Sequence, residues 1–321
     1  MKHAVVTGGA GFIGSHLVRK LYRTGWQVTV IDDLSSGKRS NLEGMPEGVA
    51  GAGKVTLVEG TVLDPGLLNA CLAGVDLVFH LAALVSVPGS IKDPLATHSV
   101  NLTGTLNVLQ AAAEGGAGKV VFFSSAAVYG DTEINPQRED LATRPLSPYA
   151  VTKLAGEYYG SVFTGVHQLP VVCIRPFNVF GPGQPPDSPY ASVIPLFISN
   201  VLQGKSPVIF GDGLQTRDFI YVKDVVAAAV LAAERGAPGV YNVGTGQAVT
   251  VTQLAEMVLS VIGSPLQPTY REERPGDIKH SRADVTRLNG LGFKPGFTFG
   301  QGIEETVRHL RQELRVPSLP A

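Results

Sequence analysis

Two side chains on one short segment have the types and the spacing of an acid–base pair. Tyr149 precedes Lys153 by four residues within the stretch SPYAVTKLAG. If this stretch is helical, the phenol and the ammonium lie on the same face, and a nearby cation stabilises the phenolate form of a tyrosine. A tyrosine with a lowered pKa can act as a general base near neutral pH. Such a pair also arises by chance, so it needs support from other residues.

Two hydroxyls supply part of that support. Ser124 and Ser125 end the apolar run KVVFFSS, which we predict to be a strand. At the carboxyl end of a parallel strand they would face the ligand crevice. There a serine can hydrogen-bond a substrate hydroxyl and the carbonyl that forms from it. Two serines after a strand also commonly cap a helix, and it is the company of Tyr149 and Lys153 that favours a catalytic role.

A glycine-rich turn near the start of the chain indicates a dinucleotide. TGGAGFIG follows an apolar β-branched run and leads directly into a helical pattern. Its glycines let the backbone approach a pyrophosphate, and the helix N-terminus offers unpaired N–H groups. The next predicted strand ends at Asp32, whose carboxylate can accept hydrogen bonds from a ribose and would repel a 2′-phosphate. We therefore expect NAD rather than NADP. Asp33 strengthens this preference, whereas Lys38 and Arg39 weaken it. A glycine turn with no ligand is the alternative.

The elements that position these groups alternate along the first half of the chain. Apolar runs that read as buried strands are separated by helical patterns, notably over residues 12–25, 97–115 and 147–163. Such alternation predicts a parallel sheet covered on both faces, which is the doubly wound α/β (Rossmann) fold.

The composition of the sequence and the lengths of its predicted elements change after about Arg175. The stretch 178–192 is rich in Pro, Gly and Ser and reads as a long loop, and an amphipathic helix is expected over 302–314. We predict an NAD-binding domain over 1–175, to which part of 217–245 also belongs. A smaller C-terminal substrate-binding lobe is expected over 176–321, interleaved with the first domain.

Composition excludes several classes of function. The 26 basic and 27 acidic residues give a net charge of −1, which provides no footprint for nucleic acid or an anionic membrane. No apolar run approaches the ~18 residues of a membrane span. Cys71 and Cys173 lie in apolar stretches and read as buried free thiols, and no metal-site spacing is visible. The sequence predicts a cytoplasmic protein that binds small molecules and no metal.

Several motifs together resemble one known group of enzymes. TGGAGFIG, SSAAVYG and SPYAVTK, in this order, are similar to motifs of the extended short-chain dehydrogenase/reductase superfamily. The resemblance continues through FHLAA, VNLTGTLNVLQAA, RPFNVFGPGQ, TRDFIYVKDV and YNVGTG. It is nearest to nucleotide-sugar 4-epimerases of the UDP-glucose/UDP-galactose type. It implies reversible, NAD-dependent inversion at C4 of a UDP-hexose through a transient 4-keto sugar.

The resemblance also implies roles for individual residues. Tyr149 resembles the base, Lys153 its partner at the nicotinamide ribose, and Ser125 the hydroxyl that orients the sugar. The cofactor contacts are expected to be Gly8, Gly11, Phe12, Ile13, Gly14, Asp32, Asp33, Ser35, Ser36, Gly37, Thr61, Val62, Leu81, Ala82, Ala83, Asn101, Ser124, Tyr149, Lys153 and Phe177. The substrate contacts are expected to be Ser125, Asn178, Val193, Phe210, Gly211, Arg217, Arg274, Asp277 and Ser281.

Three positions depart from the family pattern. Thr61 stands where the family usually has an acid near the adenine, and Val85 stands where many epimerases carry a lysine near the diphosphate. Ser281 falls where UDP-galactose-restricted members carry a bulky aromatic residue. A small residue there would leave volume for a 2-acetamido group, so UDP-N-acetylglucosamine is a second expected substrate.

Two other functions stay open beside the epimerase. A UDP-sugar dehydratase or decarboxylase would use the same fold, but in those enzymes an acid follows the catalytic Ser or Thr, where this chain has Ala126 and Ala127. A non-catalytic dinucleotide-binding protein would typically lack the tyrosine or the lysine. The helical stretches 100–115 and 147–163 are apolar over more than one face. They predict a homodimer, although burial within one subunit would produce the same pattern.

Overall fold

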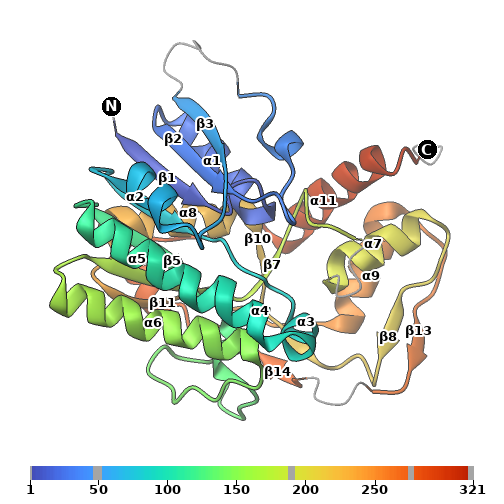
Figure 1. Cartoon of the computed structure of the whole chain (residues 1–321). Helices are drawn as coiled ribbons and strands as arrows, with labels where there is room; N and C mark the ends of the chain where they lie inside the picture. Colours follow the sequence, from blue (N-terminus) through green and yellow to red (C-terminus); the bar gives the residue numbers. More distant parts are fainter. Residues whose placement is uncertain (1, 46–52, 187–191, 274–277, 317–321) are drawn as a thin grey trace.

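The computed structural model describes residues 2–45, 53–186, 192–273 and 278–316. A parallel seven-stranded sheet, in the order β11-β6-β5-β4-β1-β2-β3, forms its centre (Figure 1). The predicted doubly wound α/β fold is confirmed. The strands are β1 (His3–Thr7), β2 (Gln27–Asp32), β3 (Lys54–Glu59), β4 (Leu77–His80), β5 (Lys119–Phe123), β6 (Val171–Pro176) and β11 (Gly239–Val243).

Alternating side chains on the strands bury two separate cores. On β1, Ala4 and Val6 face one core and Val5 faces the other, as the two-residue period of a strand requires. Helices α1 (Phe12–Arg23) and α8 (Val222–Arg235) cover the first face. The second face is covered by helices that lie side by side in Figure 1, namely α2 (Pro65–Leu72), α5 (Gly104–Glu114) and α6 (Pro148–Val166).

The predicted helix over 97–115 is not a single regular α-helix. The chain forms α3 (Val87–Lys92) and α4 (Pro94–His98), then a π-helical turn over Ser99–Thr103, and continues as α5. Apolar periodicity cannot distinguish this turn from the α-helices on either side, because the extra residue of a π-turn changes the pattern only locally.

The second half of the chain builds a smaller lobe and also completes the sheet. Strand β11 pairs with β6 at the edge of the central sheet. The short pairs are β7 (Asn178–Phe180) with β10 (Phe219–Tyr221), β8 (Val208–Phe210) with β13 (Thr269–Arg271), and β9 (Thr216–Arg217) with β12 (Val249–Thr250) and β14 (His280–Ser281). The helices are α7 (Val193–Leu202), α9 (Val251–Ile262), α10 (Thr286–Gly290) and α11 (Phe299–Glu313), with short 3₁₀ turns at Arg39–Leu42 and Ala126–Tyr129.

The details of this lobe bear on two expectations. The amphipathic stripe of the last helix is confirmed, since Ile303, Val307 and Leu310 are buried on α11. The stretch 178–192 is not a loop throughout, because it opens with β7, whose partner β10 lies about forty residues further along the chain. In the described ranges, none of the helices combines the length and the apolar character needed to cross a bilayer.

Candidate active site

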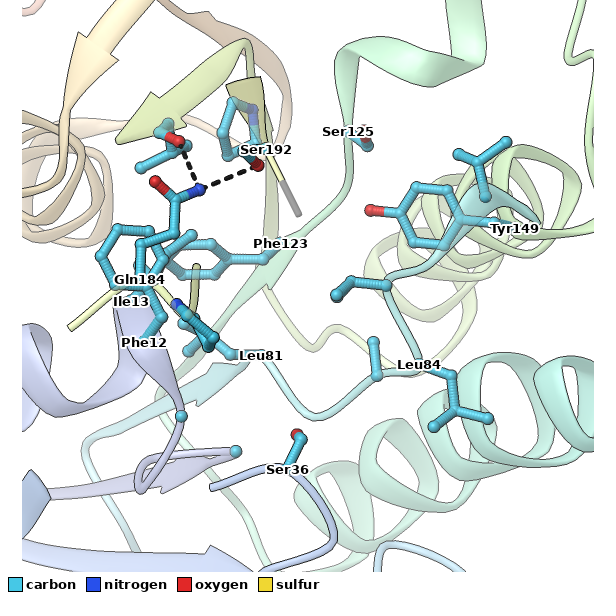
Figure 2. A pocket seen from close by; sticks show the side chains of 18 of the residues that line it. Phe12, Ile13, Ser36, Leu81, Leu84, Phe123, Ser125, Tyr149, Gln184 and Ser192 are labelled. Carbon is cyan, nitrogen blue, oxygen red and sulfur yellow. Dashed lines mark hydrogen bonds between the residues drawn. The ribbon is translucent and has the colours of Figure 1, made fainter. Parts of the chain in front are cut away.

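A cavity of about 770 Å³ opens at the carboxyl ends of the strands (Figure 2). Its lining runs from the glycine-rich turn, past the ends of β2, β4 and β5, to α7 and β8 of the smaller lobe. It contains every described residue predicted above to contact cofactor or substrate, apart from Gly37, Asn101, Gly211 and Ser281. The cavity therefore joins the two halves of the predicted site.

The glycine-rich turn has the shape of a phosphate cradle. Gly8 has φ +70°, and a Cβ there would lie 2.7 Å from the backbone nitrogen of Ala82. A Cβ on Gly14 would lie 2.2 Å from the carbonyl oxygen of Gly8, so the turn and the start of α1 pack backbone to backbone. Gly11 is the N-cap of α1 and provides no side-chain cap. The first turn of α1 thus presents its amides at the cavity, which suits the pyrophosphate of a dinucleotide.

Two neighbouring carboxylates at the end of β2 have different surroundings. Asp32 is buried; its Oδ2 accepts from Ala10 N at 2.8 Å and its Oδ1 from Leu34 N at 2.9 Å. Asp32 therefore also holds the glycine-rich turn in place. Asp33 is exposed, and its Oδ1 accepts from the backbone and side chain of Ser35, at 3.0 and 2.6 Å. Both carboxylates line the cavity, where the sequence argument expects the adenosine ribose, and they make this end of the cavity negative.

The charges around Asp32 and Asp33, which we call the ribose rim, predict how the preference for NAD over NADP can be changed. Arg39 forms an ion pair with Glu59, the last residue of β3, which pairs in register with Asp32, so the guanidinium charge is partly neutralised beside the two acids. The double variant Asp33→Asn/Glu59→Gln removes one charge that repels a 2′-phosphate and releases Arg39 to attract it. We expect the affinity for NADP relative to NAD to rise about tenfold or more. Titration calorimetry with both dinucleotides measures the ratio. An unchanged ratio would show that neither carboxylate acts on the 2′-position, and Glu59→Gln alone serves as the control for Arg39.

Tyr149, which we expect to be the base, lies in the first turn of α6. Ser147 caps this helix by accepting from Ala150 N at 3.2 Å, which fixes where the helix begins. Figure 2 shows the Tyr149 hydroxyl pointing into the cavity, toward the side that holds Ser125. Ser125 Oγ accepts from Ala127 N at 3.1 Å and keeps its own proton available to donate.

Lys153 lies one turn further along α6, as the spacing predicts. Its Nζ donates to the carbonyl oxygen of Phe123 at 2.7 Å and lies 5.9 Å from the centre of the Tyr149 ring. Burial lowers the pKa of Lys153 to about 7. The hydrogen bond thus ties the ammonium to the last residue of β5, which directly precedes the two serines.

The effect of burial on Tyr149 opposes the expectation from the sequence. Burial raises the pKa of Tyr149, and the hydrogen bond with Ser125 acts against this rise. The expected lowering by Lys153 is thus not achieved by the protein's own groups, because desolvation of a buried phenol disfavours its charged form. A sequence pattern gives the spacing of two groups but not the desolvation of each.

Four predicted contacts lie outside the lining of the cavity. Asn101 is 1% exposed and binds the backbone of Leu84. Gly37 packs on Asp32, where a Cβ would lie 2.8 Å from Oδ1. Gly211 turns the chain after β8 with φ +77°, and Ser281 Oγ lies 3.5 Å from Gln137 Oε1. The predicted contacts Arg274 and Asp277 lie outside the described residues.

The structure adds one buried group that the sequence argument missed. Glu157 accepts from Ser124 Oγ at 2.5 Å and forms a buried ion pair with Arg175, with 2.6 Å between Oε2 and Nη2. Its spacing is the signal that could have revealed it, since it lies four residues after Lys153 on the same helix face. Among the residues that the structure describes, no group of three His, Cys, Asp or Glu side chains could hold a metal ion.

The glycine cradle, the paired acids of the ribose rim and the Tyr149–Lys153 pair define a dinucleotide-dependent enzyme of the short-chain dehydrogenase/reductase type. The model of the NAD dependent epimerase/dehydratase family matches residues 4–244. The chain belongs to this family, and its cofactor is NAD.

Known relatives extend over nearly the whole chain. A UDP-glucose 4-epimerase of Mycolicibacterium smegmatis is 38% identical over 96% of this chain and 98% of its own. The solved structure of a UDP-N-acetylglucosamine 4-epimerase from Methanobrevibacter ruminantium M1, in complex with UDP-N-acetylmuramic acid, is 44% identical. It covers 97% of this chain and 99% of its own, with a TM-score of 0.93. A UDP-N-acetyl-alpha-D-glucosaminuronate decarboxylase of Bacillus cytotoxicus is 32% identical over 97% of this chain and 98% of its own.

Proposed function

We propose that this protein reversibly inverts C4 of a UDP-hexose, interconverting UDP-glucose with UDP-galactose and UDP-N-acetylglucosamine with UDP-N-acetylgalactosamine. The observation that carries the proposal is that Tyr149 and Ser125 lie side by side at the wall of a cavity that continues into the dinucleotide cradle. One acid–base pair beside one dinucleotide site can oxidise and reduce a sugar at a single carbon. The epimerase structure at 44% identity supports the 2-acetamido substrates.

Each side chain has a defined task in this reaction. Tyr149 as phenolate takes the proton of the C4 hydroxyl, and Ser125 donates a hydrogen bond to the same oxygen. The glycine-rich turn and Asp32 would hold NAD⁺, which when bound would supply the acceptor for the C4 hydride and the donor that returns it to the opposite face. The positive nicotinamide ring would lower the pKa of Tyr149, in the direction opposite to burial. Arg217, on the wall of the smaller lobe, is placed to hold the diphosphate, as guanidinium groups do well.

The wall near the sugar is apolar, which suits a sugar that must turn over. Leu84, Val85 and Val87 contribute only aliphatic side chains to the cavity. A keto sugar in contact with them meets few fixed hydrogen bonds, so it can rotate while the diphosphate stays in place. Strong polar contacts on this wall would instead hold one face of the sugar toward the cofactor.

A direct assay distinguishes the proposed reaction from its alternatives. The purified protein is incubated with UDP-galactose, UDP-N-acetylgalactosamine and UDP-glucuronic acid, and the products are followed by ¹H NMR. We expect C4 epimers of the first two, with no net formation of NADH. Loss of water would instead indicate a dehydratase. Loss of CO₂ from the uronic acid would indicate a decarboxylase, the reaction named for the Bacillus relative. No change in any sugar would indicate a binding protein.

We also propose that the protein is a homodimer formed through α6. The outward stripe of this helix is apolar, with Val151, Tyr158, Val162 and Val166 between 49% and 70% exposed. An apolar face of this kind is expected to pack against a second copy. Val162→Asp should convert the dimer to monomers in light scattering at micromolar concentration. Ile134→Asp, a similar change at a separate exposed residue, should leave the dimer intact. A wild-type protein that is already monomeric would contradict the proposal.

A further inference from the structure

A chain of buried polar side chains adjoins the cofactor cavity and has no role in the chemistry described above. It begins at Thr7, at the end of β1, and passes through His80, at the end of β4, to Thr105 on α5. All three residues are at most 1% exposed. His80 Nδ1 lies 2.7 Å from Thr7 Oγ1, and His80 Nε2 lies 2.9 Å from Thr105 Oγ1. Every polar group in such a buried chain needs a partner, because an unpaired one is costly.

Only one direction of hydrogen bonding satisfies all members of this chain. Thr105 Oγ1 donates its single proton to the carbonyl oxygen of Asn101 at 2.5 Å, because a carbonyl can only accept. Thr105 must therefore accept from His80, which places the ring proton on Nε2. Burial, with the nearby Lys153 ammonium, lowers the pKa of His80 to about 3, so the ring is neutral and Nδ1 is an acceptor. Thr7 then donates to Nδ1.

The segment 81–84 of the cavity wall is attached to both ends of this chain. At the first end, Thr7 Oγ1 accepts from the backbone N–H of Ala82 at 3.3 Å. At the other end lies Asn101, in the π-helical turn. Asn101 Oδ1 accepts from Leu84 N at 2.7 Å, and its Nδ2 donates to Leu84 O at 3.0 Å. The wall segment lines the cavity, and its backbone is thus fixed at two points.

The same asparagine connects the wall to the catalytic helix. Asn101 Nδ2 lies 3.3 Å from Thr152 Oγ1, whose hydroxyl donates to the carbonyl oxygen of Tyr149 at 2.8 Å. The wall also touches the glycine cradle, since a Cβ on Gly8 would lie 2.7 Å from Ala82 N. A shift of the wall would therefore disturb both the pyrophosphate site and the start of α6.

We propose that His80 is a positioning residue for the cofactor, whose Nε2-protonated ring holds the wall segment 81–84 and the π-helical turn in the arrangement that fits NAD. If the ring proton were on Nδ1, the lone pair of Nε2 would face a lone pair of Thr105 Oγ1. No hydrogen bond could then form between these two atoms. A valine in place of Thr105 would remove the acceptor of the His80 Nε2 proton and leave that buried proton unpaired. The inference depends on NAD binding, and it stands or falls separately from the proposed sugar reaction.

The first test reads the tautomer directly in the wild-type holoenzyme. Long-range ¹H–¹⁵N correlation spectra of protein labelled with ¹⁵N-histidine distinguish a proton on Nε2 from one on Nδ1. We expect His80 to be neutral and protonated on Nε2 from pH 5 to pH 8. A proton on Nδ1, or titration of the ring within this range, would overturn the proposal. This test needs no variant beyond His80→Gln to assign the signal.

The second test measures how fast bound NAD leaves the holoenzyme, by exchange against isotopically labelled NAD. Thr105→Val should speed release about tenfold, and Thr105→Ser, which restores the hydroxyl, should stay within about twofold of wild type. Thr306→Val is the matched control. Thr306 is also fully buried on a helix and donates to the carbonyl four residues earlier, at 2.7 Å from Gly302 O, but it lies on α11.

The outcomes separate a positioning role from general loss of stability. Thr306→Val should lower the melting temperature about as much as Thr105→Val but leave NAD release within about twofold of wild type. The proposal is overturned if Thr306→Val speeds NAD release equally, or if folded Thr105→Val releases NAD at the wild-type rate. If NAD release follows the expectation and no UDP-sugar is converted, the proposed reaction fails while the role of His80 stands.

Discussion

Replacing Tyr149 by phenylalanine is expected to lower kcat for C4 epimerisation by about 10³-fold, because the substitution removes only the hydroxyl that takes the substrate proton. Tyr149 is 8% exposed and its ring contributes to the wall of the cavity, so phenylalanine preserves the packing. Binding of NAD and of UDP should change by less than about threefold. Stopped assays by NMR with UDP-galactose give kcat, and calorimetry gives the two affinities.

The control for this variant lies on the same helix. Tyr158 is 64% exposed on α6 and does not line the cavity, so Tyr158→Phe removes a hydroxyl from the proposed dimer face and none from the site. It should keep kcat within about twofold of wild type. If Tyr149→Phe turned over both epimers at the wild-type rate, another group would have to be the base, and the mechanism proposed for this cavity would be wrong.

Replacing Lys153 by methionine is expected to lower kcat/KM at least 10²-fold and, at the same time, to make the protein more stable. Burial lowers the pKa of Lys153 from 10.5 to about 7. Between these two values the unfolded chain binds more protons than the folded one, so the free energy of unfolding rises with pH across this window. Below pH 7 the fold must hold a buried ammonium, which is unfavourable. Methionine has a similar shape and carries no charge.

The pH dependence tests this explanation. The gain in the free energy of unfolding from Lys153→Met should be largest below pH 7 and should shrink toward pH 10. Urea denaturation at pH 6, 8 and 10 measures it, with Lys205→Met, at an exposed position, as the control. A gain that is the same at all three pH values would show that the lysine is not buried as a cation. A variant that keeps full activity would show that the ammonium is not needed for the reaction.

The central sheet and the meeting of the glycine-rich turn, Ser125, Tyr149 and Lys153 at one cavity could both be predicted because each depends on local patterns. Apolar β-branched runs, the glycine-rich turn and the four-residue spacing of Tyr149 and Lys153 are short-range signals, and the structure confirms the elements that they indicate. Helix α6 begins at Pro148, within the stretch 147–163 predicted to be helical, and Ser147 and Pro148 form a standard helix N-terminus. These features need no knowledge of what packs against them.

Other features could not be predicted because they depend on distant contacts. Strand β7 forms through pairing with β10, and Asn101, in the π-helical turn, binds the backbone of Leu84, seventeen residues earlier in the chain. The rise in the pKa of Tyr149 results from burial by several elements at once. A resemblance to a family assigns Asn101 to the cofactor, and the structure adds its two hydrogen bonds with the backbone of Leu84.

The way the wall is held has a consequence for the evolution of new specificities. The backbone of segment 81–84 is held by Thr7 and Asn101, but the side chains of Leu84, Val85 and Val87 are 38%, 69% and 38% exposed. Mutations at these three positions are therefore expected to reshape this side of the cavity at little cost to folding. A combinatorial library confined to them should be rich in folded, NAD-loaded variants, from which selection can obtain enzymes for other nucleotide sugars.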